Sequence, residues 1–505
     1  MNKTFTSLLL ISTALAFVFT ANAQTAQTRV DELDRYIEDA RRTWDIPGIS
    51  VAVVQDGKVL LSKGYGVREL GKPDKADNQT LFGAMSTTKA MTAVAMGLLV
   101  DEGKIKWDDN VVDHLPWFRV NDPYITSQLK VRDLFTHNAG MPNTDILWAW
   151  AFDYSADEIL RRMQYVSPAY SFRSGFVYQN VMYVVAGKII EKASGMTWER
   201  FMMERVFGPL GMKNTFATIR GGLNYQNRSS AHYKIDGKIE VITDTYADEI
   251  GPAGSAWSTS DDMAIWMNFL MNNHRVNGLP FISQPILNEI FRPQVMTTPA
   301  AYPTYSILKP NWTTYGLGWF QHDYRGLKAD IHTGSLAGRT AIVGLLRDKK
   351  VGVYVFGNIN QTQLRHALVY KVFDVFGFDD PKGRDWSVEF KKMYDELEAN
   401  AEKQANTQLS ANLKDTKPSR PLSAYAGRYR DDLVGEIEIR FANEKLRMMI
   451  NGKPVGDLEH RQVDSFNVRW DQRWRGISII TFNLSPANGN VTGVQVAGRT
   501  MSRVS

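Results

Sequence analysis

Phe82-Gly83-Ala84-Met85-Ser86-Thr87-Thr88-Lys89 is the stretch around which the rest of the chain is organised. It contains the pattern Ser-x-x-Lys, and apolar residues at helical spacing follow it as far as Gly103, a good helix stop. We therefore expect a helix that begins at or near Ser86. Lys89 would then lie one turn further along the same face.

This arrangement suits acyl transfer. The hydroxyl of Ser86 is a poor nucleophile at neutral pH unless a base lies beside it. Lys89 is a candidate for that base, because a dry cleft disfavours the charged form of an amine. The helix N-terminus adds backbone N–H groups and partial positive charge, which stabilise a developing oxyanion. An N-cap serine followed by a solvated lysine has the same pattern, so the rest of the chain must decide.

The composition is that of an ordinary globular protein and argues against several classes of site. The chain has 505 residues, enough for two or three domains, of which 44% are hydrophobic and 22% charged. The net charge is only +5 and no run of Lys or Arg stands out, so nucleic acid is a poor candidate partner. The chain has no cysteine, and its 8 histidines are scattered without a His-Glu-x-x-His pattern. We therefore expect no disulfide, no metal and no other cofactor.

The first 23 residues have the pattern of a cleavable export signal. Lys3 supplies the positive start, residues 8–19 are mostly apolar, and Ala21-Asn22-Ala23 is a small-x-small cleavage site. The apolar part is short for a membrane span, and no later stretch of 18 apolar residues follows. We expect a periplasmic or secreted protein without a membrane anchor.

After the signal at 1–23 the sequence divides into three parts. Residues 24–385 mix helical periodicity with β-rich segments, including a hairpin predicted across Asp56-Gly57. Residues 386–420 form a charged helical connector and a linker rich in Pro, Ser and Lys. Residues 421–505 predict a separate all-β domain, either a sandwich or a small barrel. Its strands are predicted at 437–439, 446–450, 466–470, 477–482 and 491–496.

Residues 144–176 are irregular and rich in aromatic side chains. Aromatic side chains in such a segment most often belong to a local core. The alternative is the wall or lid of a pocket, and the sequence leaves both open.

Two further motifs come later in the chain, each beside a predicted element. Tyr178-x-Asn180 precedes a helix predicted to run to about Gly195. His332-Thr333-Gly334 lies on a strand that leads into a β-hairpin at 341–356. They are accompanied by a loop, His137-Asn138-Ala139-Gly140-Met141-Pro142, and by a serine-rich turn that opens with Gly251-Pro252-Ala253-Gly254-Ser255.

In this order the motifs resemble those of the serine β-lactamase and penicillin-binding-protein superfamily, specifically the class C β-lactamase-related hydrolases. The resemblance covers about residues 30–378. It implies an α/β (α+β) fold in which helices cover both faces of an antiparallel sheet, giving three layers. The part at 421–505 is similar, more loosely, to the lipocalin-like domain often appended to such hydrolases, which implies an all-β barrel-like domain.

The resemblance also implies a role for each motif residue. Ser86 would attack a carbonyl carbon, and Lys89 and Tyr178 would share its proton. The sequence does not decide which of the two is the base, since the pair can titrate as a unit. Asn180 would bond Lys89 or a substrate amide. The backbone N–H groups of Ser86 and Ser335 would form the oxyanion hole.

His332 departs from the pattern of the β-lactamases and transpeptidases, which usually carry Lys at this position. Histidine is mostly neutral at pH 7, so a fixed anchor for a substrate carboxylate is weaker here. Among relatives, histidine at this position looks more like esterases and peptidases that act on small or D-residue-containing peptides. Thr333 belongs to the same substrate-binding strand, and Gly334 lets a substrate approach its edge closely.

The sequence thus predicts an exported, metal-independent serine hydrolase that acts on a small molecule or short peptide. Within that class we favour a peptidase or amidase over a carboxylesterase, and an esterase over a dedicated β-lactamase. An alternative from another class is a peptide- or peptidoglycan-binding protein on an inactive hydrolase scaffold, although the intact motifs argue against it. No Gly-x-Ser-x-Gly occurs, so a Ser-His-Asp α/β-hydrolase is not supported. A homo-oligomer is left open.

Overall fold

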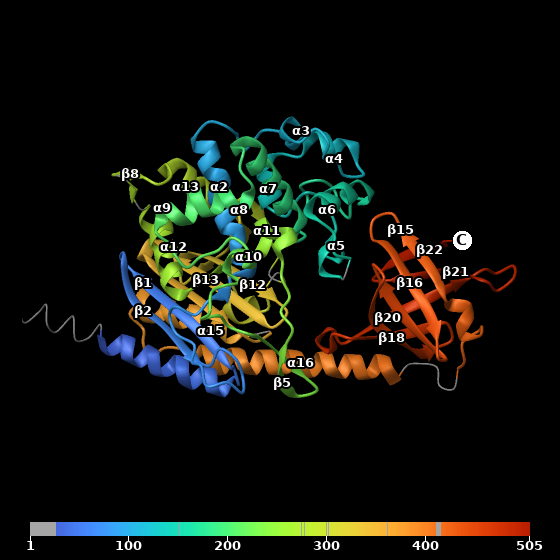
Figure 1. Cartoon of the computed structure of the whole chain (residues 1–505). Helices are drawn as coiled ribbons and strands as arrows, with labels where there is room; N and C mark the ends of the chain where they lie inside the picture. The colour runs from blue at the N-terminus through green and yellow to red at the C-terminus, as the bar shows by residue number, and fades with distance from the viewer. Residues whose placement is uncertain are drawn as a thin grey trace, which may run out of the picture.

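The computed structural model describes residues 27–504 except 151, 274, 277, 299, 301, 361 and 411–415, so the predicted signal at 1–23 lies outside the described residues. Two β-structures dominate the described chain (Figure 1): an eight-stranded sheet in the first part and a closed barrel near the C-terminus. The long helix α16 (Trp386–Ser410) runs from the first toward the second. Such a helix was predicted for the connector.

The sheet is antiparallel throughout, in the order β2-β1-β14-β13-β12-β11-β10-β9. Asp56 and Gly57 both have positive φ, +48° and +80°, which a two-residue hairpin turn between β1 and β2 requires. The strands are β1 Gly48–Gln55, β2 Lys58–Gly66, β9 Val295–Met296, β10 Thr313–Tyr315, β11 Phe320–Tyr324, β12 Leu327–Leu336, β13 Arg339–Leu346 and β14 Val351–Gly357.

Helices cover both faces of this sheet. Alternate residues of β1 belong to different apolar cores: Ala52 and Val54 pack on one face, Val51 and Val53 on the other. α12 packs against the first face of β1 and β14, and α15 lies on the second with the helical segment 27–43. The predicted three-layer α/β fold is therefore confirmed.

The helices of this part are α2 Thr88–Asp101, α3 Val111–His114, α4 Pro123–Gln128, α5 Ile146–Ala149, α6 Ala156–Arg162, α7 Val181–Ser194, α8 Trp198–Phe201, α9 Gly208–Leu210, α10 Ile219–Gly222, α11 Gly251–Gly254, α12 Ser260–Asn272, α13 Gln284–Ile290, α14 Tyr305–Leu308 and α15 Leu364–Val372. Short two-stranded pairs join β3 Phe82–Gly83 to β6 Trp257–Ser258, β4 Ala231–Ile235 to β5 Lys238–Ile242, and β7 Arg275–Val276 to β8 Leu279–Pro280.

The expectation of a helix that begins at or near Ser86 is confirmed, and one local expectation needs correction. Ser86 does not begin the α-helix itself but lies in a single 3-10 turn, η1 (Met85–Thr87), and α2 follows from Thr88. The turn expected at 251–255 is instead a short helix, α11, because its backbone packs against α7 and α2. Tertiary contacts here override the poor helix propensity of glycine and proline.

The C-terminal part is a closed eight-stranded barrel, as the barrel-like alternative predicted. Each strand pairs antiparallel with the next, and β15 pairs with β22 to close the ring. Large side chains, among them Tyr429, Phe466 and Phe482, fill its core. The five predicted strands fall in β16, β17, β19, β20 and β21, whereas β15, β18 and β22 were not predicted. The barrel strands are β15 Gly427–Asp431, β16 Gly435–Ala442, β17 Lys445–Ile450, β18 Lys453–Gln462, β19 Ser465–Trp470, β20 Ile477–Leu484, β21 Val491–Val496 and β22 Arg499–Val504.

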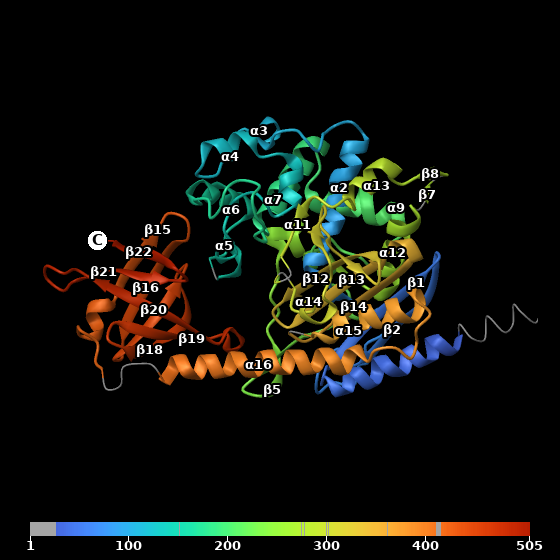
Figure 2. The ribbon, with the colours of Figure 1, turned by 180° about the vertical axis from the view of Figure 1, so that it is seen from behind.

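The barrel contacts the part of the chain that contains the eight-stranded sheet through the aromatic segment that follows α5, and Figure 2 shows the barrel beside α5 and α6. The rings of Trp150 and Trp470 meet edge to face with centroids 5.1 Å apart. The Tyr154 hydroxyl donates to the Val434 carbonyl at 2.9 Å, and Arg475 Nη1 donates to the Ala149 carbonyl at 3.0 Å. Among the described helices, none combines the length and the apolarity needed to cross a membrane.

Candidate active site

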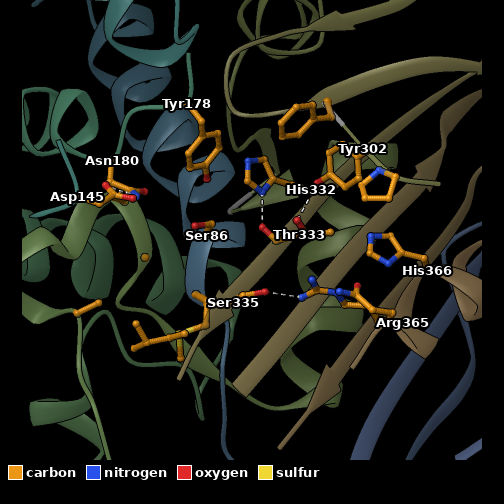
Figure 3. Close-up of a pocket in the computed structure, with 18 of the residues that line it drawn as sticks. Ser86, Asp145, Tyr178, Asn180, Tyr302, His332, Thr333, Ser335, Arg365 and His366 are labelled. Carbon is orange, nitrogen blue, oxygen red and sulfur yellow. Dashed lines mark hydrogen bonds between the residues drawn. The ribbon is translucent and has the colours of Figure 1, made fainter. Parts of the chain in front are cut away.

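A cavity of about 640 Å³ lies where strand β12 passes η1 and α11 (Figure 3). Six of the eight predicted site residues line it: Ser86, Tyr178, Asn180, His332, Thr333 and Ser335. Lys89 lies directly behind Ser86, and Gly334 forms the backbone between two lining residues. The structure thus brings the three motifs together around one cavity.

Ser86 is held in a tight backbone arrangement. Met85, the residue before it, has a φ of +50°, a left-handed conformation that costs a non-glycine residue about 1–3 kcal/mol. A Cβ on Gly334 would lie 2.4 Å from the Ala84 carbonyl oxygen and 2.9 Å from the Ser86 nitrogen. Glycine is therefore required here because the chain's own backbone approaches β12, a stronger constraint than the predicted approach of a substrate. This contact brings the β12 backbone beside the N–H group of Ser86.

Lys89 is fully buried, and no carboxylate among the described residues forms a hydrogen bond or ion pair with it. Its Nζ donates to Ser86 Oγ at 3.2 Å, to Asn180 Oδ1 at 2.7 Å and to the Ala253 carbonyl at 2.8 Å. Burial lowers the pKa of Lys89 to about 7, and the charge of Asp145 offsets only part of that effect. A substantial fraction of Lys89 is consequently a neutral amine at pH 7.

Tyr178 lies in the cavity wall with its hydroxyl directed toward Ser86 in Figure 3. Its ring packs on His137, with centroids 4.2 Å apart, and Lys89 Nζ is 4.7 Å from the ring centroid. Burial raises the pKa of Tyr178 well above its usual range, and the interaction with Ser86 offsets only part of the shift. Tyr178 is therefore a neutral phenol at pH 7.

Asn180 connects the lysine to Asp145, a residue that the sequence analysis missed. While Asn180 Oδ1 accepts from Lys89, its Nδ2 donates to both carboxylate oxygens of Asp145, at 2.9 and 3.1 Å. Asp145 also accepts from the indole N–H of Trp148 at 2.9 Å. The available signal was an acidic residue just after the His137–Pro142 loop.

His332 belongs to a hydrogen-bonded chain of neutral groups. Its Nδ1 donates to the Thr333 carbonyl at 2.7 Å, so its Nε2, 3.0 Å from the Tyr315 hydroxyl, is the acceptor. His137 accepts from the backbone N–H of Gln179 through Nδ1 at 2.9 Å and lies 3.2 Å from the same Tyr315 hydroxyl through Nε2. Burial lowers the pKa of His332 to about 3. His332 is thus an uncharged wall of the site, and His137 fixes its loop.

The opposite wall comes from parts of the chain for which no site was predicted. Gln363, Arg365 and His366, at the start of α15, line the cavity, as does Tyr394 of α16. The Tyr302 hydroxyl lies 2.8 Å from Thr333 Oγ1. The sequence signal for Arg365 was a charged residue among the apolar residues of a closing helix. In the part of the chain that the structure describes, no group of three or more His, Asp or Glu side chains is arranged to hold a metal ion.

Trp148 and Phe176 bear on the question left open for the aromatic segment 144–176. Both line the cavity. Phe152 of the same segment is buried in the core instead. The segment therefore serves both purposes.

Comparison with known proteins identifies families that match the two parts of the chain. Residues 33–375 match the family model described as Beta-lactamase, and residues 411–503 match one described as a Domain of unknown function (DUF3471). An unguisins hydrolase of Aspergillus violaceofuscus is 27% identical over 438 residues, which cover 81% of this chain and 76% of that protein.

Two solved structures share the fold over nearly the whole chain. The octameric penicillin-binding protein homologue from Pyrococcus abyssi is 20% identical with a TM-score of 0.60, over 94% of this chain and 99% of that one. SurE, crystallised with D-Leu, is 18% identical with a TM-score of 0.56, over 94% of this chain and 100% of that one. With a family model that covers more than half of its length and the three motifs around one cavity, the chain belongs to the beta-lactamase family.

Proposed function

We propose that this protein is a serine hydrolase that cleaves amide bonds of small or short peptide substrates through an acyl-enzyme on Ser86. The observation that carries the proposal is the state of Lys89. A buried amine with a pKa of about 7 lies 3.2 Å from Ser86 Oγ and is oriented by Asn180 and the Ala253 carbonyl. An amine with this pKa is well matched to general base catalysis near neutral pH.

In the proposed mechanism, Lys89 rather than Tyr178 is the base. Neutral Lys89 takes the proton of Ser86 while Oγ forms a bond to the substrate carbonyl carbon. The oxyanion is bound by the backbone N–H groups of Ser86 and Ser335. As the C–N bond breaks, the phenol of Tyr178 donates its proton to the leaving nitrogen and recovers one from the Lys89 ammonium. Water then attacks the acyl-enzyme with the same groups in the reverse roles.

Three observations favour a peptidase or amidase. The unguisins hydrolase is a relative named for hydrolysis of unguisins, and the solved structure of SurE contains D-Leu. His332 is uncharged here, so the strand position where β-lactamases and transpeptidases usually carry a lysine has no cation. D-residue-containing or modified peptides are therefore the substrates to test first, with carboxylesterase and β-lactamase activity as the alternatives.

The first experiment is labelling of Ser86. We expect a fluorophosphonate to add one adduct, located by mass spectrometry on the peptide that contains Ser86. Ser86→Ala is expected to lose both the adduct and turnover of an activated ester while keeping its circular dichroism spectrum. Full activity in that variant would rule out the mechanism. No adduct with any serine-reactive probe would favour a binding protein on an inactive scaffold.

A panel of substrates then separates the candidate activities. We expect L- and D-aminoacyl amides to be cleaved with higher kcat/KM than short-chain esters, and nitrocefin with the lowest. A clear preference for esters or nitrocefin would replace the peptidase proposal with the corresponding alternative.

We also propose that residues 1–23 direct export and that 24–385, 386–420 and 421–505 are the hydrolase domain, connector and barrel domain. A mature N-terminus at Gln24 would support the first proposal. Light scattering on the purified protein will show whether it assembles, as its relative from Pyrococcus abyssi does.

A further inference from the structure

The two N–H groups of the proposed oxyanion hole come from segments that are far apart in the sequence. Ser86 is reached through β3, whereas Ser335 lies on β12, and Figure 3 shows the two residues next to each other. Both N–H groups must lie about 3 Å from one oxygen atom, so the relative position of β3 and β12 decides how well an oxyanion is bound. A side chain that joins these two strands would therefore affect the rate without touching the substrate.

Arg339 is such a side chain. It is fully buried at the start of β13, paired in register with Leu336 of the β12–β13 hairpin, and Leu336 lines the cavity. Its guanidinium carbon lies 4.8 Å from the centroid of the Trp257 ring, and Trp257 is the partner of Gly83 in the β3–β6 pair. A Cβ placed on Gly83 would lie 3.5 Å from the Cδ of Arg339, in ordinary van der Waals contact. Arg339 thus packs between the hairpin that carries one N–H group and the strand that leads to the other.

Asp244 holds the guanidinium in this place. Nη2 of Arg339 donates to Asp244 Oδ1, and no other carboxylate among the described residues pairs with Arg339. Arg228 contacts the same carboxylate, with its Nη2 3.5 Å from Oδ2. Asp244 belongs to the segment between β5 and α11, which also supplies Ala247 and Ile250 to the cavity wall. The ion pair therefore joins a third part of the site to the two strands.

The guanidinium has little else to keep it in position. Its Nε and Nη1 are buried and form no hydrogen bond with a described residue. A buried cation that loses its counterion is strongly unfavourable, so without Asp244 the side chain and the hairpin attached to it would move. We propose that Asp244 and Arg339 are positioning residues that hold the N–H group of Ser335 in line with that of Ser86. This inference rests on the proposed hydrolase function and concerns only the alignment of its oxyanion hole.

The first test is Asp244→Asn, which keeps the shape of the side chain but removes its charge. We expect kcat for an activated ester to fall on the order of 10- to 100-fold, with KM changed less than about threefold, because misalignment weakens binding of the transition state. Affinity for phenyl trifluoromethyl ketone should fall by a similar factor. Ser86 Oγ adds to the carbonyl carbon of this ketone, its proton passes to Lys89, and the ketone oxygen becomes an oxyanion in the hole.

Asp374→Asn is the matched control. Asp374 is also buried and pairs with an arginine, Arg325, but it does not line the cavity. We expect this variant to lose thermal stability as well, while its kcat and its affinity for the ketone stay within about threefold of wild type. Losses of kcat and ketone affinity that are equal in the two variants would overturn the proposal, since they would follow from destabilisation alone.

The pH profile separates an effect on the oxyanion hole from an effect on the base. The pKa of Lys89 is affected by burial and by the charge of Asp145, so kcat/KM of Asp244→Asn should rise with pH through the same midpoint as wild type. A shifted midpoint would show that the ion pair acts on Lys89 and would overturn the proposal.

A rescue experiment tests the charge itself. The side chain of Asp244 is 21% exposed, so a small anion can enter the space that Asp244→Ala leaves. We expect formate to restore kcat in this variant and neutral formamide not to. Equal effects of the two additives would contradict a role for the ion pair.

A double variant covers the case in which Asp244→Asn does not fold. Asp244→Leu combined with Arg339→Met removes both charges and so leaves no uncompensated cation. We expect the same losses of kcat and ketone affinity, and wild-type values in this protein would overturn the proposal. Failure of the proposed function is seen separately, as the lack of a fluorophosphonate adduct on Ser86 in the wild-type protein.

Discussion

The two ends of the cavity differ in how completely their polar groups are satisfied. Around Ser86, Lys89 has three hydrogen-bond partners, and Asn180 uses both ends of its amide. At the start of α15, Arg365 and His366 have buried nitrogens that form no hydrogen bond with a described residue. The first end is preorganised before any substrate arrives, whereas several polar groups at the second end are left unsatisfied. Substitutions at the first end should therefore change kcat.

The largest effect is expected for Lys89→Met at the preorganised end. Methionine fills the buried space but removes the amine that contacts Ser86. We expect kcat/KM for an activated ester to fall on the order of a thousandfold, mainly through kcat. Circular dichroism and a thermal melt serve as the folding control. Activity within tenfold of wild type would instead point to Tyr178 as the base.

A smaller loss is expected for Tyr178→Phe, on the order of 100-fold in kcat, because the proton donor to the leaving group is removed. Tyr302→Phe is the matched control, since it also removes one phenol oxygen from the cavity wall but on the side of Thr333. We expect its kcat to change less than about threefold. Equal losses in the two variants would show that the hydroxyl next to Ser86 has no special role.

The pH dependence tests the state of Lys89 directly. Since the neutral amine is the proposed base, kcat/KM should rise with pH through about 7, the pKa of Lys89. His332 has a pKa of about 3, so its titration does not change kcat/KM in this pH range. The negative charge of Asp145 raises the pKa of Lys89. Asp145→Asn should therefore move the midpoint of the rise in kcat/KM to lower pH. An unchanged midpoint in the Asp145→Asn variant would mean that a group other than Lys89 causes the rise in kcat/KM.

The same pKa shift predicts a change in stability. The pKa of Lys89 is about 7 in the folded protein and 10.5 in its ordinary state, so between these values the unfolded chain binds more protons. The contribution of Lys89 to the free energy of unfolding should therefore increase as the pH rises from about 7 toward 10.5. Urea unfolding of the wild type and of Lys89→Met across this range isolates that contribution. Parallel pH dependences in the two proteins would contradict the shifted pKa.

The sequence revealed the motifs at the Ser86 end because each is short and is tied to a local element. Ser86 and Lys89 are separated by one helical turn, and His332 to Gly334 lie on one strand. Asp145 and Arg365 belong to no such motif, and the signals they carry, an acidic residue after a loop and a charged residue in an apolar helix, are weak. Asp145 reaches the site only because its segment folds back on Asn180, and Arg365 only because α15 packs behind β12. Their places in the site arise from tertiary approach, which residue spacing alone does not encode.

A similar limit explains the missed barrel strands. β18 (Lys453–Gln462) buries only Val455, Gly456 and Leu458, and most of its remaining side chains are charged or polar. A strand with so short an apolar pattern is hard to separate from a loop. It is held instead by its pairing with β17 and β19 on both sides. The strands that were predicted, such as β20, have longer apolar runs.

The smallest effect is expected where the barrel meets the cavity wall. Arg475 holds the Ala149 carbonyl, next to Trp148, which lines the cavity. Arg475→Ala should loosen this wall and raise KM about two- to threefold, with no change in the rate at which a small fluorophosphonate labels Ser86. Arg473→Ala is the matched control, because Arg473 also bridges to the hydrolase part but pairs with Asp236 and Glu240, on the exposed β4–β5 hairpin. If both substitutions raise KM equally, the barrel acts through its general docking rather than through the segment that carries Trp148.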